Sequence, residues 1–269
     1  MNLLIGDIGN TNTKICLVEE KEFKIKKIVY IDSKNINSSK YLISIIQKII
    51  QKKHINKVAL FSSVVPKYFL VLKKIFNNVF NIKLKEIKEK KIKKIVKINI
   101  KNHNQVGSDR IANAVGVYSF YKQNCIVLDF GTATTFDVVT KNGNYNGGII
   151  APGINLSLKS LINKADQIPV FSIQKQKKII GKNTLQALRS GFYWGYSGLI
   201  NNIILKIEKE TKKKYKIIFT GGYANLFTKS IARPFTVDKN ITIKGIIEIY
   251  KINKKYLNKW EIKILFFVL

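Results

Sequence analysis

One short segment occurs twice in the chain, and this repeat constrains the fold more than any other feature. The first copy, residues 3–14, reads LLIGDIGNTNTK, and the second, residues 126–135, reads IVLDFGTATT. Each copy has a short apolar run, then Asp-x-Gly, then small hydroxyl and amide side chains, and each leads into a second apolar run. Because Asp7 and Asp129 are 122 positions apart, a little under half of the 269-residue chain, we expect two related halves whose loops face a common cleft.

The residue types within each copy suit a phosphate and its metal ion. The apolar run is too short for an ordinary helix and predicts a buried strand. Gly9 and Gly131 permit a tight turn, in which backbone N–H groups can form an anion-binding nest. An aspartate beside a phosphate implies an intervening cation, since Mg²⁺ is held by one or two carboxylates plus phosphate oxygens. A plain hairpin turn explains one copy equally well, and the matching second copy favours the phosphate site.

Further glycine-bearing motifs accompany the repeat. They read GSDR at 107–110, GGIIAPG at 147–153, GKNT at 181–184 and TGG at 220–222. With the two repeat copies, in this order and spacing, the sequence resembles the type III pantothenate kinases from Leu3 to about Tyr250. That family belongs to the acetate kinase, sugar kinase, Hsp70 and actin superfamily.

The resemblance implies an α/β fold of two ribonuclease-H-like (actin-like ATPase) domains, each a mixed sheet with flanking helices. Alternating strand-like and helix-like stretches agree with an α/β class. The strand-like runs are 3–5, 58–62, 125–129, 135–139 and 216–220, and the helix-like stretches are about 40–53, 108–123, 185–211 and 243–250. We expect an N-terminal domain at 1–118 and a C-terminal domain at 119–269 with an apolar C-terminal extension, Ile262–Leu269.

The resemblance also implies ATP-dependent phosphorylation of pantothenate to 4′-phosphopantothenate, the first step of coenzyme A biosynthesis. The cofactors would be Mg²⁺ with ATP and a monovalent cation, K⁺ or NH4⁺, at Asp129. Asp7 would hold Mg²⁺ through the phosphates, and Lys14 either reaches a phosphate oxygen or is an exposed strand lysine. The predicted ATP-binding residues are Asp7, Ile8, Gly9, Asn10, Thr11, Asn12, Thr13, Lys14 and Thr132.

The GSDR motif is expected to bind the acceptor. Ser108 is a suitable helix N-cap, and Asp109 then lies in the first turn, where the helix dipole favours a carboxylate. Taken alone, the motif is better explained as a helix cap with Arg110 as a surface ion-pair partner. The resemblance makes Asp109 the general base, makes Arg110 a ligand of the substrate, and brings the backbone of Gly107 and Ser108 close to it.

Two further expectations come from the resemblance. Thr184 would contact the substrate from the partner subunit of a homodimer, although it is also a plausible N-cap before Leu185. Family members often have a tyrosine where this chain has Ile100, so the contact with pantothenate is either lost or replaced by an apolar one.

A net charge of +32 in 269 residues raises the question of nucleic-acid binding. Only three of the 48 basic residues are arginine, whereas readers of nucleic-acid bases rely on arginine. The excess of Lys, Ile and Asn, residues specified by A+T-rich codons, favours a solvated lysine surface, and we interpret Lys83–Lys101 as a solvated connection. We therefore expect no specific nucleic-acid partner.

We further expect a cytoplasmic protein without a membrane segment, because the apolar tail is too short to span a bilayer. Cys16 and Cys125 lack metal-ligand spacing and are expected to be core residues. Two rival interpretations remain open: a kinase of the same superfamily with another acceptor, and a kinase-like regulatory or nucleic-acid-binding protein.

Overall fold

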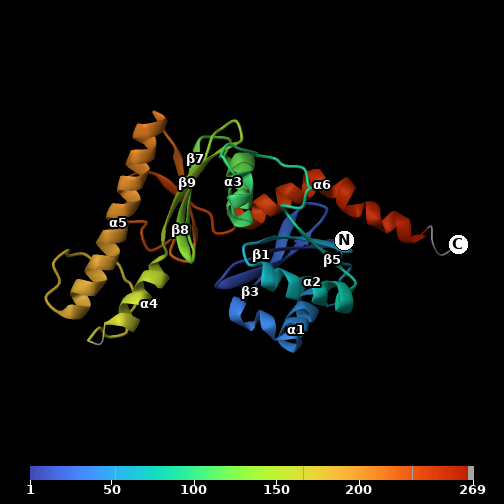
Figure 1. The fold of residues 1–269 in the computed structure, drawn as a ribbon, viewed down its shortest axis with the longest axis horizontal. Helices are drawn as coiled ribbons and strands as arrows, with labels where there is room; N and C mark the ends of the chain where they lie inside the picture. Colours follow the sequence, from blue (N-terminus) through green and yellow to red (C-terminus); the bar gives the residue numbers. More distant parts are fainter. Residues whose placement is uncertain (52, 166, 232, 266–269) are drawn as a thin grey trace. The chain divides into compact units, whose positions relative to one another are not determined.

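The computed structural model describes residues 1–51, 53–165, 167–231 and 233–265, which form two compact units (Figure 1). The first unit contains residues 1–120 and the C-terminal segment from Asn240, and the second contains Tyr121–Lys239. The break after Phe120 lies close to the expected boundary. The division differs from the expected one because the C-terminal segment groups with the first unit.

Helix α6 (Ile241–Leu265) accounts for this grouping. It packs on strands β1 (Asn2–Ile8) and β4 (Val58–Ser63) of the first unit. Gly245 lets it approach helix α3 (Ser108–Tyr121) closely, since a Cβ there would lie 1.8 Å from the carbonyl oxygen of Ala112. The helix is longer than the expected stretch 243–250 and includes the beginning of the predicted apolar tail, of which residues 266–269 lie outside the described residues.

The first unit is built on a five-stranded mixed sheet with the order β3-β2-β1-β4-β5. Strand β2 (Asn12–Glu19) is antiparallel to β1 and to β3 (Lys24–Asp32), whereas β1, β4 and β5 (Lys83–Glu86) are parallel. The carboxyl ends of these three parallel strands therefore meet at one edge of the sheet, where motif residues gather.

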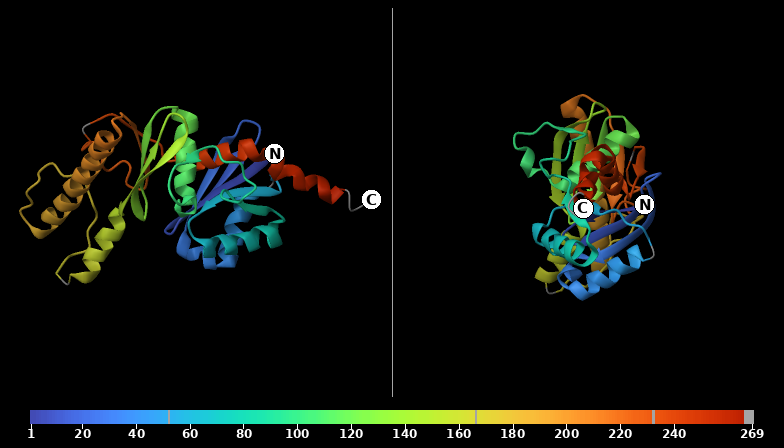
Figure 2. Two further views of the ribbon diagram at one scale, coloured as in Figure 1. Left: turned by 45° about the horizontal axis from the view of Figure 1, so that its top comes forward. Right: turned by 90° about the vertical axis from the view of Figure 1, so that its right-hand side faces the viewer.

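Helices cover both faces of this sheet (Figure 2). Helices α1 (Ser39–Ile50) and α2 (Pro66–Phe80) pack against Leu4, Ile8 and Phe61, all fully buried, while α6 lies on the opposite face. A short 3-10 helix, η1 (Ser33–Asn37), connects β3 to α1.

The second unit repeats this strand pattern. Its strands β9-β8-β7-β10-β11 match β3-β2-β1-β4-β5 of the first unit in order, and every pair has the same relative direction. The strands are β7 (Cys125–Phe130), β8 (Ala133–Val139), β9 (Asn144–Pro152), β10 (Lys216–Gly221) and β11 (Phe235–Val237). The prediction of two related halves is thus confirmed, as are the expected strands at both repeat copies.

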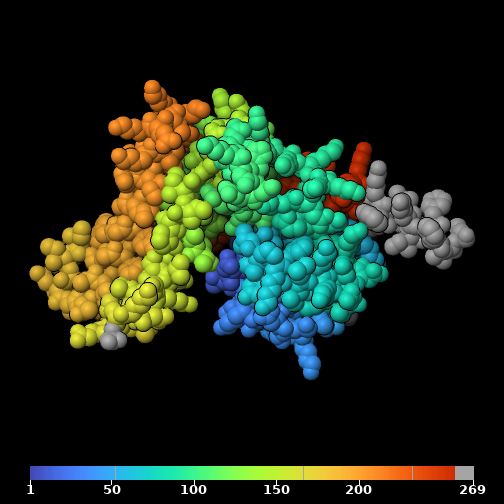
Figure 3. All heavy atoms as spheres, viewed as in Figure 1, coloured from blue at the N-terminus to red at the C-terminus, as the bar shows by residue number. Residues whose placement is uncertain are grey.

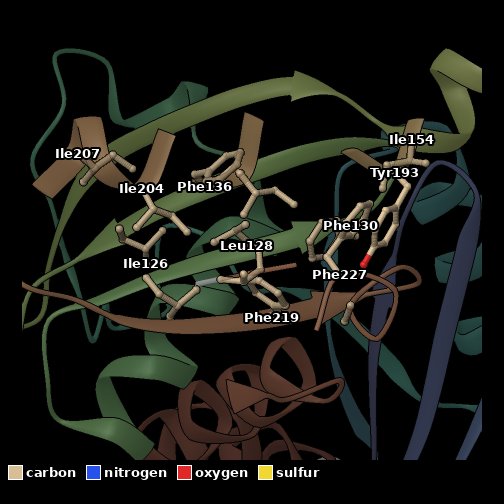
Figure 4. Packing of buried hydrophobic residues seen from close by; sticks show 14 of the residues in the cluster. Ile126, Leu128, Phe130, Phe136, Ile154, Tyr193, Ile204, Ile207, Phe219 and Phe227 are labelled. Carbon is tan, nitrogen blue, oxygen red and sulfur yellow. The ribbon is translucent and has the colours of Figure 1, made fainter. Parts of the chain in front are cut away.

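A cluster of buried aliphatic and aromatic side chains forms the core of the second unit (Figure 4). Helices α4 (Ile154–Lys164) and α5 (Thr184–Thr211) contribute Ile154, Tyr193 and Ile204 to it. The ring of Phe130 stacks on Phe227 at 5.6 Å. Because strand side chains alternate between faces, this anchoring of Phe130 turns the preceding residue, Asp129, to the other face of the sheet.

The lysine-rich stretch 83–101 was expected to be a solvated connection, and that expectation is wrong for its apolar residues. Strand β5 belongs to the sheet, and a two-residue strand β6 (Lys97–Ile98) and the 3-10 helix η2 (His103–Gln105) follow it. Five apolar side chains of this stretch are buried, at 0 to 7% exposure: Leu84, Ile87, Ile92, Val96 and Ile98. Because lysines separate these apolar residues, the sequence resembles that of a solvated loop.

Cys16 and Cys125 are buried free cysteines, as expected, and burial raises the pKa of each thiol to about 12. Within the described part of the chain, no helix combines the length and the apolar character that a membrane crossing requires.

Candidate functional site

The first repeat copy forms a hairpin between β1 and β2. Its turn closes where the Gly9 N–H donates to the carbonyl oxygen of Asn12 at 3.1 Å. A Cβ at Gly9 would lie 2.9 Å from that same oxygen, so the turn requires glycine. Asn10, Thr11 and Asn12 are exposed at the tip. The turn therefore offers polar groups to a ligand, as the motif predicts.

A serine from another part of the chain fixes this turn. The Ser33 hydroxyl donates to the Gly9 carbonyl oxygen at 2.7 Å, and the Ser33 N–H donates to the Thr11 carbonyl oxygen at 2.8 Å. The hydroxyls of Thr13 and Ser33 lie within hydrogen-bond distance, 3.1 Å apart. The side chains of Thr13 and Ile8 are fully buried. Of the predicted ATP-binding residues, these two therefore point away from solvent.

Asp7 lies between two polar side chains on neighbouring strands. It is in register with Lys14 on β2 and with Ser62 on β4. Such partners have Cβ atoms about 5 Å apart. The Ser62 hydroxyl donates to Asp7 Oδ1 at 2.6 Å. Lys14 is half-buried, and its register with Asp7 puts the two side chains on the same face of the sheet.

The acceptor motif meets the carboxyl end of β4. The Ile111 N–H donates to the Gly107 carbonyl oxygen at 3.1 Å, so Gly107 holds the N-cap position of α3. The expectation that Ser108 is the N-cap is therefore wrong. Its hydroxyl instead bonds the backbone of Ser63, accepting from the N–H at 2.8 Å and donating to the carbonyl at 2.7 Å. These two bonds fasten the motif to β4.

Asp109 lies in the first turn of α3, as predicted. Its Oδ1 accepts from the backbone N–H of Arg110 at 2.7 Å. A Cβ at Gly107 would lie 2.5 Å from the same oxygen, so glycine leaves room for the carboxylate. Ser62, which bonds Asp7, directly precedes Ser63, which bonds Ser108. The structure thus brings the phosphate turn and the acceptor motif to one edge of the first sheet.

In the second unit, Asp129 lies between two threonines. It is in register with Thr135 on β8 and with Thr220 on β10, so the three side chains share one face of the sheet. Both threonine Oγ1 atoms are buried and have no hydrogen-bond partner among the described residues. Buried polar atoms are seldom left unsatisfied, so these hydroxyl oxygens are candidate ligands for a group beside Asp129.

Two further glycine motifs contact the second repeat copy. Gly221 has a φ of +85°, and a Cβ there would lie 2.7 Å from Asp129 Oδ1. The Gly222 N–H donates to the Phe130 carbonyl oxygen at 3.1 Å. A Cβ at Gly153 would lie 2.0 Å from the carbonyl oxygen of Thr132. Thr132 itself is exposed. The structure therefore brings the second repeat copy together with residues 153 and 220–222.

Thr184 is the first residue of α5 and is exposed. The N-cap is Asn183, whose side chain accepts from the Gln186 N–H at 2.9 Å, so the alternative N-cap role of Thr184 is wrong. The segment from α4 to the start of α5, yellow to gold in Figure 3, exposes large apolar side chains. They are Leu156, Val170, Ile179 and Ile180. Exposed apolar side chains, where they form a contiguous patch, are typical of a protein interface.

No three His, Cys, Asp or Glu side chains come together as a metal cluster in the described ranges. The candidate cation ligands are thus the single carboxylates of Asp7 and Asp129, each with hydroxyl neighbours. Sequence reasoning missed Ser33, Ser62, Thr135 and Thr220 as supporting residues. The last two were visible as parts of known motifs, whereas a single serine in another strand or 3-10 helix carries no signal in the sequence.

Comparison with known families gives one consistent result. The model of the family described as type III pantothenate kinase matches residues 3–206. A type III pantothenate kinase of Pelagibacter ubique is 50% identical over 91% of this chain and 97% of its own. One from a Sulfurihydrogenibium species is 37% identical over the same shares of the two chains.

Solved structures agree on the fold. A Campylobacter jejuni protein, described as a member of the Baf family of transcriptional activators, gives a TM-score of 0.61 at 22% identity, covering 94% of this chain and all of the other. The activator of the 2-hydroxyisocaproyl-CoA dehydratase of Clostridium difficile, solved with bound ADPNP, gives 0.53 at 12% identity, covering 95% and 97%. At such identities the likeness concerns the fold alone.

Proposed function

Because the chain belongs to the type III pantothenate kinase family, we propose that it transfers the γ-phosphoryl group of ATP to the primary hydroxyl of pantothenate. The products are 4′-phosphopantothenate and ADP, and the reaction is the first step of coenzyme A biosynthesis. The observation that carries this proposal is the Ser62–Ser63–Ser108 linkage, which holds the Asp7 turn and the Asp109 motif at one edge of the first sheet.

Phosphoryl transfer depends on positioning and charge neutralisation more than on covalent chemistry. The backbone and exposed side chains of Gly9, Asn10, Thr11 and Asn12 bind the phosphates of ATP, and Lys14 pairs with a phosphate oxygen. Mg²⁺, when bound through the phosphates at Asp7, neutralises negative charge. The carboxylate of Asp7 and the hydroxyl oxygen of its neighbour Ser62 are hard oxygen ligands of the kind that Mg²⁺ prefers.

Asp109 receives the proton of the pantothenate hydroxyl as the new O–P bond forms. A carboxylate suffices as base because the transition state is loose and the hydroxyl loses its proton late. The first turn of α3 is a favourable place for the negative charge of Asp109. Arg110 binds the carboxylate or amide of pantothenate with its planar fork of donors, and the backbone of Gly107 and Ser108 lies against the substrate.

Asp129 holds a monovalent cation, K⁺ or NH4⁺, beside the nucleotide phosphates, and Thr132 contacts those phosphates. The buried hydroxyls of Thr135 and Thr220 in register with Asp129 support this assignment. One carboxylate with neutral oxygen donors suits an ion of single charge, which needs less anionic charge than a divalent ion.

The enzyme acts as a cytoplasmic homodimer, in which Thr184 of each subunit contacts the substrate of the other. The exposed apolar residues beside α5 support such an interface. Binding of specific nucleic acid sequences is not part of the proposal, since the positive charge resides in lysines.

The test is to incubate the protein with ATP, Mg²⁺, K⁺ and pantothenate, and to follow 4′-phosphopantothenate by mass spectrometry. Asp109→Asn should lower kcat about 100-fold or more, the usual contribution of a general base. Glu19→Gln, in a surface ion pair with Lys26, is the matched carboxylate control and should leave kcat unchanged. Near-normal turnover in Asp109→Asn would remove it from the role of base. Folded protein that binds ATP without forming product would point to another acceptor.

A further inference from the structure

The turn that follows strand β5 contacts the acceptor motif. Glu86 is the last residue of β5, and the Ile87 N–H donates to the Phe61 carbonyl oxygen of β4 at 3.0 Å. The turn therefore leaves the sheet at the edge where Ser63 binds Ser108. No motif in the sequence marks this turn.

Lys88 bonds the segment that leads into the acceptor motif. Its Nζ donates to the carbonyl oxygens of Asn104 at 3.0 Å and Val106 at 2.9 Å. Its backbone N–H donates to Glu86 Oε2 at 2.6 Å. One residue thus joins the end of β5 to the two carbonyls that precede Gly107.

The carboxyl group of Glu86 lies beside Ser108, the first residue of α3. Its Oε1 is buried and has no hydrogen-bond partner in the described ranges. Burial raises the pKa of its carboxyl group, and the Lys88 N–H counters this effect in part. The Ser108 hydroxyl and the Ser63 N–H lie beside the carboxyl group, but each is hydrogen-bonded to the other residue. The Ser108 proton is committed to the Ser63 carbonyl. An ionised Glu86 therefore lacks a donor for Oε1, whereas a protonated one can itself donate to Ser108 Oγ.

Glu89 and Lys85 form an ion pair beside this turn. Glu89 Oε1 accepts from the Glu86 N–H at 3.3 Å, and Glu89 Oε2 pairs with Lys85 at 2.5 Å. The Lys88 ammonium faces the two carbonyls, and Asp109 lies next to Ser108 in the chain. The negative charge of Glu89 is thus neutralised by Lys85.

We propose that Glu86 and Lys88 are positioning residues, which hold segment 104–110 against the sheet and so set the place of Asp109 relative to the acceptor. Lys88 fixes the segment before Gly107, and Glu86 supports Ser108 after it. The inference rests on the proposed role of the Asp109 motif. It adds two residues, from a turn outside every motif, that act through the segment and do not touch substrate.

Lys88→Met is the first test, because the side chain is exposed and its loss should not impair folding. KM for pantothenate should rise about tenfold, the loss expected for hydrogen bonds from a charged group, while KM for ATP stays within about twofold. Lys90→Met, an exposed lysine of the same turn, is the matched control and should change neither. Equal changes in both KM values, or none in Lys88→Met, would overturn the proposal.

Glu86 is tested by a pair of variants. Glu86→Gln keeps an acceptor for the Lys88 N–H and supplies a donor toward Ser108, so it should retain the wild-type KM for pantothenate. Glu86→Ala should raise that KM. In the wild type, kcat/KM for pantothenate should fall as pH rises through the raised pKa of Glu86, and Glu86→Gln should lack this step. A pH profile identical in the wild type and Glu86→Gln would refute the assignment of Glu86.

Amide hydrogen exchange separates this inference from the proposed function. In Lys88→Met, amides of residues 106–111 should exchange faster than in the wild type, and those of the β1–β2 hairpin should not. If the wild type made no 4′-phosphopantothenate but exchange changed as expected, the kinase assignment would fail and the positioning role would stand. Unchanged exchange in an active wild-type background would refute the positioning role alone.

Discussion

Replacing Gly221 by alanine should weaken both the second unit and its cation site. Gly221 has a φ of +85°, in the region that side-chain-bearing residues avoid. A Cβ would lie 2.6 Å from Phe130 N and 2.7 Å from both Phe130 O and Asp129 Oδ1. Two of these atoms are backbone, and the third belongs to the proposed cation ligand, so none is the loose end of a flexible side chain.

The magnitude follows from these contacts. The left-handed conformation costs about 1 to 2 kcal/mol for a residue with a Cβ, and forcing extra volume into a packed site costs about 1 to 3 kcal/mol more. We expect the free energy of unfolding to fall by about 2 to 5 kcal/mol. Some of the strain should displace the Asp129 carboxylate. A loss of about 1.4 kcal/mol in cation binding would raise the K⁺ concentration for half-activation about tenfold.

Gly222→Ala is the matched control, because the nearest atom to its added Cβ, Phe130 O, is 4.0 Å away, an ordinary contact. Chemical denaturation gives the stability of both variants, and initial rates over a K⁺ titration give the half-activation concentration. Equal stability and equal K⁺ dependence in the two variants would refute the argument from close packing. A loss of stability in Gly221→Ala with unchanged K⁺ dependence would refute the link to Asp129.

Three further predictions concern other parts of the chain. Replacing K⁺ by Na⁺ should sharply lower the rate of the wild type, and Asp129→Asn should abolish this difference; an unchanged wild-type rate in Na⁺ would contradict the cation assignment. Ile100→Tyr, which restores the residue frequent in the family, should lower KM for pantothenate roughly fivefold through aromatic contact, and an unchanged KM would show that the position does not reach the substrate. Burial acts to raise the pKa of Glu208, but Arg233, whose NH1 lies 2.7 Å from Glu208 Oε2, outweighs it, and the pKa is lowered. Lys214 and the Tyr215 N–H still contact the carboxylate when Arg233 is removed, so Arg233→Met should cost about 1.5 kcal/mol near neutral pH, the value of one hydrogen bond to a charged group. A lowered carboxyl pKa stabilises the fold above the pKa of the unfolded state, and this contribution is lost as pH falls through the pKa of the folded state. The difference in free energy of unfolding between wild type and variant should therefore shrink in acid denaturation. A constant difference would contradict the ion-pair account.

The repeat predicted the two hairpins well because their signal is local. A short apolar run, Asp-x-Gly and small polar residues determine strand, turn and strand within about a dozen positions, and both hairpins form there. The register then follows from the alternation of apolar side chains. The same local signals predicted the strands at Val58 and Lys216 and the helix that begins at Ser108.

Residues that act across strands could not be predicted in this way. Ser33, Ser62 and Glu86 reach the motifs only because neighbouring strands end at one edge of the sheet. The grouping of the C-terminal segment with the first unit depends on the fit of Gly245 against Ala112, a contact between distant parts of the chain. High lysine content obscured the strand at Lys83, since apolar positions between charges resemble a solvated loop.

The shared strand pattern of the two units has a consequence for charge balance. At the equivalent strand end of each sheet, the register partners of the aspartate differ: Lys14 and Ser62 beside Asp7, Thr135 and Thr220 beside Asp129. Carboxylate and ammonium sum to zero in the first unit, whereas two neutral hydroxyls leave one negative charge in the second. The same strand arrangement thus provides two different sites. The site at Asp7 is neutral overall and can bind an anion together with its metal ion, whereas the site at Asp129 is negative and is neutralised by one monovalent cation.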